Sequence, residues 1–276
     1  MKRMQLTGIA LLLMTGIPVI SMAQDKVEAD IGADFVSGYI WRGQDLGNVS
    51  IQPSASVSYK GFSLSGWGSV GLDKEDTKEF DLTLGYSTGG FSVSVTDYWF
   101  DGGPEYFHYG AHNTSHVFEA QVGYDFGPLA VNWYTNFAGA DGVKANGNRA
   151  YSSYFSIAAP FKLGGLDWSA EIGATPWETS FYNNGASGFE VSNICLGASK
   201  EIKITDSYSL PVFAQAIWNP ATEGAYFVFG ISSNPKDILQ YKYNTTSIGI
   251  SDFKRQKRLY RITNNTNTNT IYYEKD

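Results

Sequence analysis

Apolar and polar residues alternate with a period of two between residues 30 and 231, and this pattern restricts the chain to β-structure. The clearest runs cover 80–84, 91–96 and 118–122. Because successive side chains of a strand point to opposite faces, each run has one apolar and one polar face. We expect strands near 30–42, 50–60, 62–71, 79–87, 91–100, 116–125, 129–137, 150–161, 166–177, 189–201, 207–218 and 224–232. We also expect bulges near 193–196 and 209–213.

The connections between these strands alternate in length. The turns at 60–61, 87–90, 125–128 and 162–165 are short, whereas the loops at 43–49, 72–78, 101–115, 138–149 and 178–188 are longer. A transmembrane barrel has short turns on one side and long loops on the other, and its strands are about ten residues long. The pattern predicts an all-β, transmembrane antiparallel up-and-down β-barrel of about 12 strands. A soluble β-sandwich is the alternative.

Aromatic residues mark the ends of the expected strands. The chain contains 18 tyrosines, 17 phenylalanines, 7 tryptophans and 30 glycines, and only 17% of its residues are charged. Beside the short turns lie Tyr59, Phe62, Tyr86, Phe91, Tyr124 and Phe161. Beside the long loops lie Trp41, Trp99, Phe137, Trp177 and Trp218. Two aromatic belts are expected where a barrel crosses the two membrane–water interfaces, although ordinary strand packing also enriches aromatic residues.

The first 23 residues predict a cleaved signal peptide. Lys2 and Arg3 begin it, an apolar run covers 9–20, and Ser21-Met22-Ala23 supplies small residues for cleavage. A membrane-spanning helix is the alternative, but the run is too short for one. Residues 24–232 then form the expected barrel. With Cys195 as the only cysteine, no internal disulfide can form.

The C-terminal segment differs from the expected barrel in charge. Residues 24–232 hold 10 Lys and Arg against 23 Asp and Glu, whereas 233–276 hold 8 against 4. We expect 233–276 to be a disordered, Asn/Thr-rich basic tail, with a small folded module as the alternative. The preceding run 225–231 resembles the terminal strand that the barrel-insertion machinery recognises. That machinery and outer-membrane lipid are therefore expected partners.

Several segments resemble known outer-membrane barrels. The stretch 34–43 (DFVSGYIWRG) resembles the first strand of the TorF-like porin family, and 47–59 resembles its second strand. The segments 96–100, 114–120 and 175–177 are similar to parts of Bacteroidetes-type outer-membrane barrels. The resemblance covers about residues 30–232 and implies a barrel with passive transport. It identifies no functional residue.

The polar face of the strands predicts a wet lumen. Its small members are Ser54, Ser56, Ser58, Ser63, Ser65, Ser69, Ser92, Ser94, Thr96, Asn132, Asn136, Ser152 and Ser156. Twelve strands enclose a space between that of a filled barrel and that of an open channel, so a closed structural barrel is the alternative. The expected lumen-lining residues that set selectivity are Asp30, Asp34, Arg42, Glu79, Asp81, Glu119, Asp167 and Glu171. Glu190 and Lys60 share this face. Excess carboxylates favour cations if the lumen conducts, but they could instead serve inter-strand pairing.

Signatures of other chemistry are weak. His108, His112 and His116, with Glu105 and Glu119 nearby, could bind a divalent ion, but a solvated loop is the better interpretation of their loose spacing. Ser115 and His116 are adjacent and would point to opposite faces of a strand, so we expect no enzyme. We also expect no metal and no cofactor. A nucleic-acid partner is not expected either, because the barrel segment is acidic.

Together these patterns predict an exported outer-membrane porin of a Gram-negative cell. It would pass small solutes, cations among them, through a narrow polar lumen by passive diffusion. The alternative is a non-conducting outer-membrane barrel whose long loops, above all 101–115, bind a surface ligand or partner.

Overall fold

The computed structural model describes residues 26–233, except 75, 77, 112, 183–187 and 207. The strands are β1 (Glu28–Val36), β2 (Tyr39–Trp41), β3 (Gln44–Gly47), β4 (Ser50–Tyr59), β5 (Phe62–Gly71), β6 (Lys78–Thr88), β7 (Phe91–Phe100), β8 (His116–Asp125), β9 (Ala130–Gly139), β10 (Ser153–Leu163), β11 (Leu166–Thr175), β12 (Glu190–Lys203), β13 (Ser209–Asn219) and β14 (Gly224–Ser232). Within this described part, no helix is long and apolar enough to cross a membrane.

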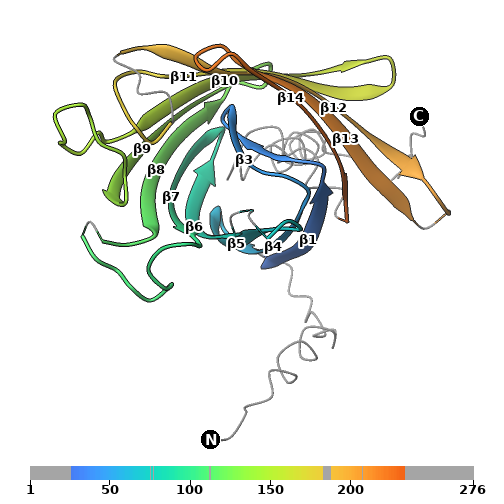
Figure 1. Ribbon diagram of the computed structural model, residues 1–276. Helices are drawn as coiled ribbons and strands as arrows, with labels where there is room; N and C mark the ends of the chain where they lie inside the picture. Colours follow the sequence, from blue (N-terminus) through green and yellow to red (C-terminus); the bar gives the residue numbers. More distant parts are fainter. Residues whose placement is uncertain are drawn as a thin grey trace, which may run out of the picture.

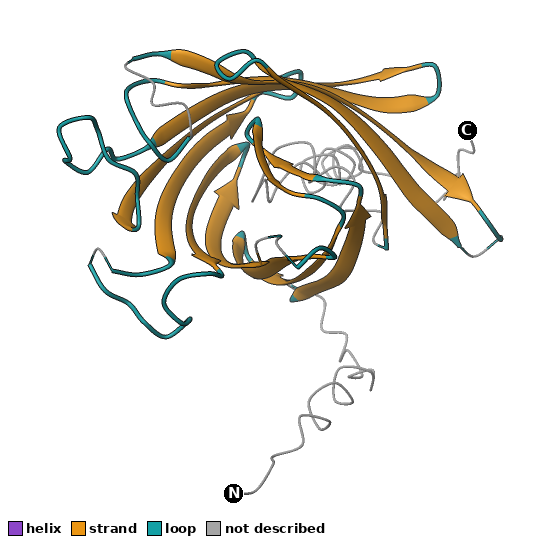
Figure 2. Ribbon diagram, in the orientation of Figure 1, coloured by secondary structure: helices purple, strands orange, loops and turns teal. Residues whose placement is uncertain are grey.

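Twelve of the strands form one closed barrel (Figures 1 and 2). Its order is β1-β14-β13-β12-β11-β10-β9-β8-β7-β6-β5-β4, and every neighbouring pair is antiparallel. The barrel closes between β1 and β14, where Asp34, Phe35 and Val36 pair with Ser232, Ile231 and Gly230. Closure leaves no free sheet edge along the paired strands, which is the condition for β-structure to cross a bilayer. The predicted fold class, a barrel of about twelve strands, is confirmed.

The turn between β4 and β5 is as short as a hairpin turn can be. Tyr59 pairs directly with Phe62, so the turn between β4 and β5 consists of Lys60 and Gly61 alone. Both residues have positive φ, 52° and 83°. Two positive φ angles in a two-residue loop define the type I′ turn, which matches the twist of the flanking strands. This turn explains why the connection at 60–61 is tight.

The two faces of the strands lie in different surroundings. Outward-pointing positions are apolar and exposed, for example Leu84 and Phe229, each with 61% of its surface accessible. Inward-pointing positions include Ser58 opposite Ser63 and Thr83 opposite Thr96. The barrel is therefore apolar outside and mainly polar inside, the reverse of a soluble barrel.

The first expected strand, 30–42, is wrong at its C-terminal end. The run 30–42 was expected as a single strand with a solvent loop at 43–49, but β1 ends at Val36 and residues 39–47 fold into the separate β2–β3 hairpin. Figure 1 shows this hairpin, in blue, inside the ring of strands. The chain leaves the wall after Ser37, whose amide and hydroxyl both bond to the Phe229 backbone. β14 continues to Gly224, past the point where the chain leaves the wall.

The remaining expectations have mixed outcomes. A register shift lies opposite Ser192, between Gly173 and Ala174, next to the bulge expected near 193–196. The bulge expected at 209–213 is wrong, because β13 pairs with both neighbours without a shift. The expected signal peptide at 1–23 and, apart from Ser233, the expected tail at 233–276 lie outside the described residues.

Candidate lumen constriction

The tip of the β2–β3 hairpin carries Arg42 into the lumen. Trp41 pairs with Gln44, so Arg42 and Gly43 alone form the turn, with φ angles of 51° and 81°. This is the type I′ geometry also seen at Lys60 and Gly61. A two-residue turn projects its first side chain from the very end of the hairpin, which places the guanidinium at the farthest point from β1.

The tip is held against the nearby wall formed by β12 and β13. The Asn219 side-chain amide donates to the Gly43 carbonyl oxygen at 3.0 Å. A Cβ at Gly43 would lie 1.9 Å from the Ser192 carbonyl oxygen, so only glycine allows this approach. Ile40 packs on an apolar cluster of the wall, whose members are Val36, Phe213, Ile217 and Val228. The hairpin thus folds into the lumen from β1 and docks on the neighbouring part of the wall, β12 to β14.

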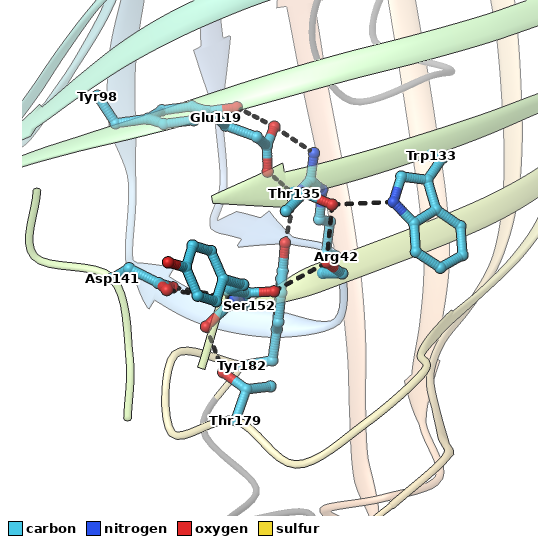
Figure 3. Close-up of polar contacts among 11 residues, drawn as sticks. Arg42, Tyr98, Glu119, Trp133, Thr135, Asp141, Ser152, Thr179 and Tyr182 are labelled. Atoms are coloured by element: carbon cyan, nitrogen blue, oxygen red, sulfur yellow. Dashed lines mark hydrogen bonds and ion pairs between the residues drawn. The ribbon is translucent and has the colours of Figure 1, made fainter. Parts of the chain in front are cut away.

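Arg42 makes a buried ion pair with Glu119 of β8 (Figure 3). Its Nη1 lies 2.6 Å from Oε2 and its Nη2 lies 2.9 Å from Oε1, a bidentate arrangement. Nη1 also donates to the Tyr182 hydroxyl. Arg42 is 1% exposed and Glu119 is 2% exposed. An unpaired charge at this depth would be costly, so each partner requires the other.

Aromatic rings surround the same guanidinium. Its carbon lies 3.9 Å from the centre of the Tyr134 ring, 4.3 Å from that of Trp41 and 4.8 Å from that of Tyr154. Desolvated contacts of this kind contribute about 2 kcal/mol or more each in favourable cases. Together with Tyr98, Val117 and Tyr182 these rings form one buried cluster. We call Arg42, Glu119 and these aromatic residues the Arg42 plug.

Further hydrogen bonds join the plug to the wall on both sides. On one side the Tyr98 hydroxyl donates to Glu119 Oε1 at 2.9 Å. On the other side Tyr154 donates to Glu171 Oε1 at 2.9 Å, and the Asn193 amide donates to the same oxygen at 2.9 Å. The network therefore reaches from β7 to β12 through the hairpin tip.

The loop between β11 and β12 covers the plug from the long-loop end. Tyr182 stacks on Trp41 with ring centres 5.9 Å apart. Burial raises the pKa of Tyr182, so its hydroxyl stays protonated beside Arg42. Thr179 bonds to Ser152 at 2.5 Å, and the Trp177 indole donates to the Ala150 carbonyl oxygen at 3.0 Å. At the level of Arg42 the lumen is filled by buried side chains.

The short-turn end of the lumen is different. Here inward residues of β4 and β5 carry small hydroxyl groups, and Ser56 is exposed although it points inward. Farther round the wall, Gln121 bonds to Ser94 at 2.8 Å and to Asn132 at 3.1 Å. The inward face is therefore small and polar at the short-turn end, whereas it is filled by large buried side chains at Arg42.

The structure places the predicted lumen residues at different depths. It brings Arg42 and Glu119 into contact. The buried, inward-facing carboxylates are Asp34, Glu79, Asp81 and Glu171. Asp30 of β1 is in register with Ser56 of β4. Asp167 lies beside the short turn between β10 and β11, where its carboxylate forms an ion pair with Lys162 at 2.6 Å. Glu79 and Asp81 hydrogen-bond to each other, whereas Glu119 is the carboxylate of this set that forms an ion pair with the buried Arg42.

Sequence reasoning missed the aromatic half of the plug. Tyr98, Tyr134 and Tyr154 have the parity of the polar face, the same as Thr96, Asn132 and Ser156. Large aromatic residues on an otherwise small, polar face were the available signal for a filled lumen. The hairpin had a signal too, since Arg42-Gly43 repeats the pattern of Lys60-Gly61.

The histidines do not form a metal site among the described residues. No group of three or more His, Cys, Asp or Glu side chains there could hold an ion, and His112 lies outside them. His116 faces outward, and its ring nitrogens contact Asp97 at 2.7 Å and the Tyr106 carbonyl oxygen at 2.5 Å. Both nitrogens are thus engaged, and neither is left for Ser115 to use as a catalytic base.

These features define the class of the molecule: a closed antiparallel barrel with an apolar outer wall and a polar inner face, the architecture of transmembrane β-barrels. No family model and no curated protein matches the sequence. The resemblance to the TorF-like family therefore stays an expectation. Among solved structures the chain is similar to a KdgM porin, at 10% identity and a TM-score of 0.41, over 75% of this chain and 99% of the other.

Proposed function

We propose that the protein is an outer-membrane diffusion channel whose narrow lumen the Arg42 plug obstructs at the long-loop end, so that solutes pass only when the plug is displaced. The observation that carries this proposal is the contrast along the lumen, with an exposed inward serine, Ser56, at one end and a filled layer at Arg42. Outward apolar residues on all sides support a lipid environment. Transport would be passive, with solutes exchanging water for hydroxyl contacts.

The charge of the lumen favours cations. Asp30, Asp34, Glu79, Asp81 and Glu171 face inward, whereas the buried cation Arg42 is already neutralised by Glu119. Rings of carboxylates select cations in channels, since they lower the energy of a positive ion in a narrow space. The proposed solutes are therefore small, polar and neutral or positively charged.

Planar-bilayer recording tests the channel and its selectivity together. The wild-type protein should show small, discrete conductance steps and a reversal potential that favours K⁺ over Cl⁻ in a salt gradient. The Asp30→Asn/Asp34→Asn double variant should move that potential toward zero. Asp101→Asn is the matched control, because Asp101 is an exposed loop residue paired with Lys78, and should change nothing. An unchanged potential in the double variant would remove the carboxylate argument.

A second candidate is a non-conducting barrel whose long loops bind a ligand or partner. The buried cross-section at Arg42 favours it, because every ring of the plug is at most 5% exposed. The same recording separates the two, since this candidate gives no conductance steps. In either case we propose export to the outer membrane, with lipid and the insertion machinery, acting on β14, as partners.

A further inference from the structure

The outer wall carries one charged residue at a depth where its neighbours are apolar. Asp97 of β7 points outward, in register with Leu82 of β6 and Phe118 of β8. A carboxylate that faces acyl chains without a partner is strongly unfavourable. The Asp97 side chain is nevertheless only 14% exposed, so something on the outside of the barrel covers it.

That cover is the β7–β8 loop, of which the structure describes residues 101–111 and 113–115. His116 joins Asp97 to the Tyr106 carbonyl oxygen, and the Tyr109 hydroxyl lies 3.4 Å from the other Asp97 oxygen. The His116 side chain is fully buried between wall and loop. The loop is therefore fixed to the outer wall through the Asp97–His116 pair.

Aromatic contacts extend this attachment. The Tyr106 ring lies 5.7 Å from Phe80, 5.8 Å from Trp99 and 5.2 Å from His116, all outward-facing residues. Tyr109 stacks on His116 at 4.1 Å. Figure 1 shows this loop, in green at the lower left, outside the ring of strands. It lies along the wall, continuous with the apolar outer surface of β6, β7 and β8.

Two aromatic residues of the loop are exposed, between the exposed polar residues Glu105, His108 and Asn113. Phe107 is 88% exposed and Tyr109 is 54% exposed, and both lie in a loop that the wall contacts hold in place. In water such a phenylalanine is unfavourable, whereas at a membrane interface aromatic rings are stabilised. Neither ring belongs to the buried aromatic cluster around Arg42.

We propose that the β7–β8 loop is a membrane-interface anchor that inserts Phe107 into the bilayer on the long-loop side. Its partner is the lipid surface, contacted by Phe107 and Tyr109, and the Asp97–His116 pair sets the angle of the loop. The inference rests on the proposed membrane location of the barrel. It differs from the expectation that this long loop projects into water to bind a soluble ligand.

Spin-label accessibility in vesicles of dimyristoylphosphatidylcholine tests the anchor. In a Cys195→Ala background, nitroxides are attached at Phe107→Cys, at Ile172→Cys on the outer wall and at Asn146→Cys in the exposed β9–β10 loop. Relaxation by oxygen reports lipid, and relaxation by a water-soluble nickel chelate reports water. The oxygen-to-nickel ratio at 107 should be several-fold higher than at 146 and close to that at 172.

The outcomes are separable. A label at 107 that behaves like the one at 146, while 172 reports lipid, overturns the anchor and leaves the proposed channel standing. A label at 172 that also reports water overturns the membrane location itself. Adding His116→Ala should move 107 toward the value at 146 and leave 172 unchanged, and an unchanged 107 contradicts the role of the Asp97–His116 pair.

Discussion

The Arg42 guanidinium holds both carboxylate oxygens of Glu119, at 2.6 and 2.9 Å, across 77 residues of sequence and inside a barrel wall. This ion pair joins the β2–β3 hairpin, a separate two-stranded sheet, to β8. Without this ion pair the hairpin would keep its apolar contacts at Ile40 but would lose the charged contact between its tip and β8. The pair therefore couples the stability of the barrel to the closure of its lumen.

Removing one charge of this pair should destabilise the barrel. Glu119→Gln leaves Arg42 buried without a counter-ion, and we expect the free energy of unfolding to fall by about 3–5 kcal/mol. Urea unfolding in lipid vesicles, followed by heat-modifiable gel mobility, measures it. Asp167→Asn is the control, since it breaks an exposed pair with Lys162 and should cost about 1 kcal/mol or less. Equal losses in the two variants would contradict the buried pair.

A side chain at Gly43 should displace the hairpin. Gly43→Ala adds a Cβ that would meet the Ser192 carbonyl oxygen at 1.9 Å, and it also strains a positive φ. Gly89→Ala has the same strain, φ 56°, with nothing within 4 Å, and should cost only about 1–2 kcal/mol. We expect only Gly43→Ala to increase single-channel conductance. An increase in both variants, or in neither, would be inconsistent with a tip docked on β12.

The charge of Arg42 should control both size and selectivity of the pathway. Arg42→Asn keeps a residue that tolerates the left-handed turn but removes the guanidinium. We expect larger conductance steps and a stronger preference for K⁺, because Glu119 then faces the lumen unpaired. Lys60→Asn changes a cation in the same kind of turn at the short-turn end and should leave the step size unaltered. If Arg42→Asn behaves like Lys60→Asn, the plug does not limit transport.

The Tyr154 hydroxyl should contribute to stability more than an exposed hydroxyl does. Tyr154→Phe removes one of the two donors to Glu171 Oε1, a loss of about 1–3 kcal/mol in the free energy of unfolding. Tyr151→Phe, at a side chain 52% exposed, should be neutral within about 0.5 kcal/mol. The same urea titration compares them. Identical midpoints would show that the Glu171 network is not required.

Much of the barrel could be predicted from the sequence, because its signals are local. Alternation gives strand faces, and turn residues such as Lys60-Gly61 give strand ends. Arg42-Gly43 gives the turn of the β2–β3 hairpin in the same way, but the path of residues 39–47 into the lumen could not be predicted by these rules. Their departure depends on contacts far along the chain, with Ser192, Asn219 and Glu119. The outward Asp97–His116 pair was not predicted for the same reason, because it is covered by a loop whose conformation the alternation does not determine.

Thiol accessibility of two neighbouring residues tests the central claim most directly, namely that the polar face of the strands encloses water and the apolar face contacts lipid. Ser56 points into the lumen and Ala55 points out from the same strand. In a Cys195→Ala background in vesicles, a charged, membrane-impermeant methanethiosulfonate should modify Ser56→Cys rapidly and Ala55→Cys slowly. Faster modification of Ala55→Cys, or equal rates, would contradict the account.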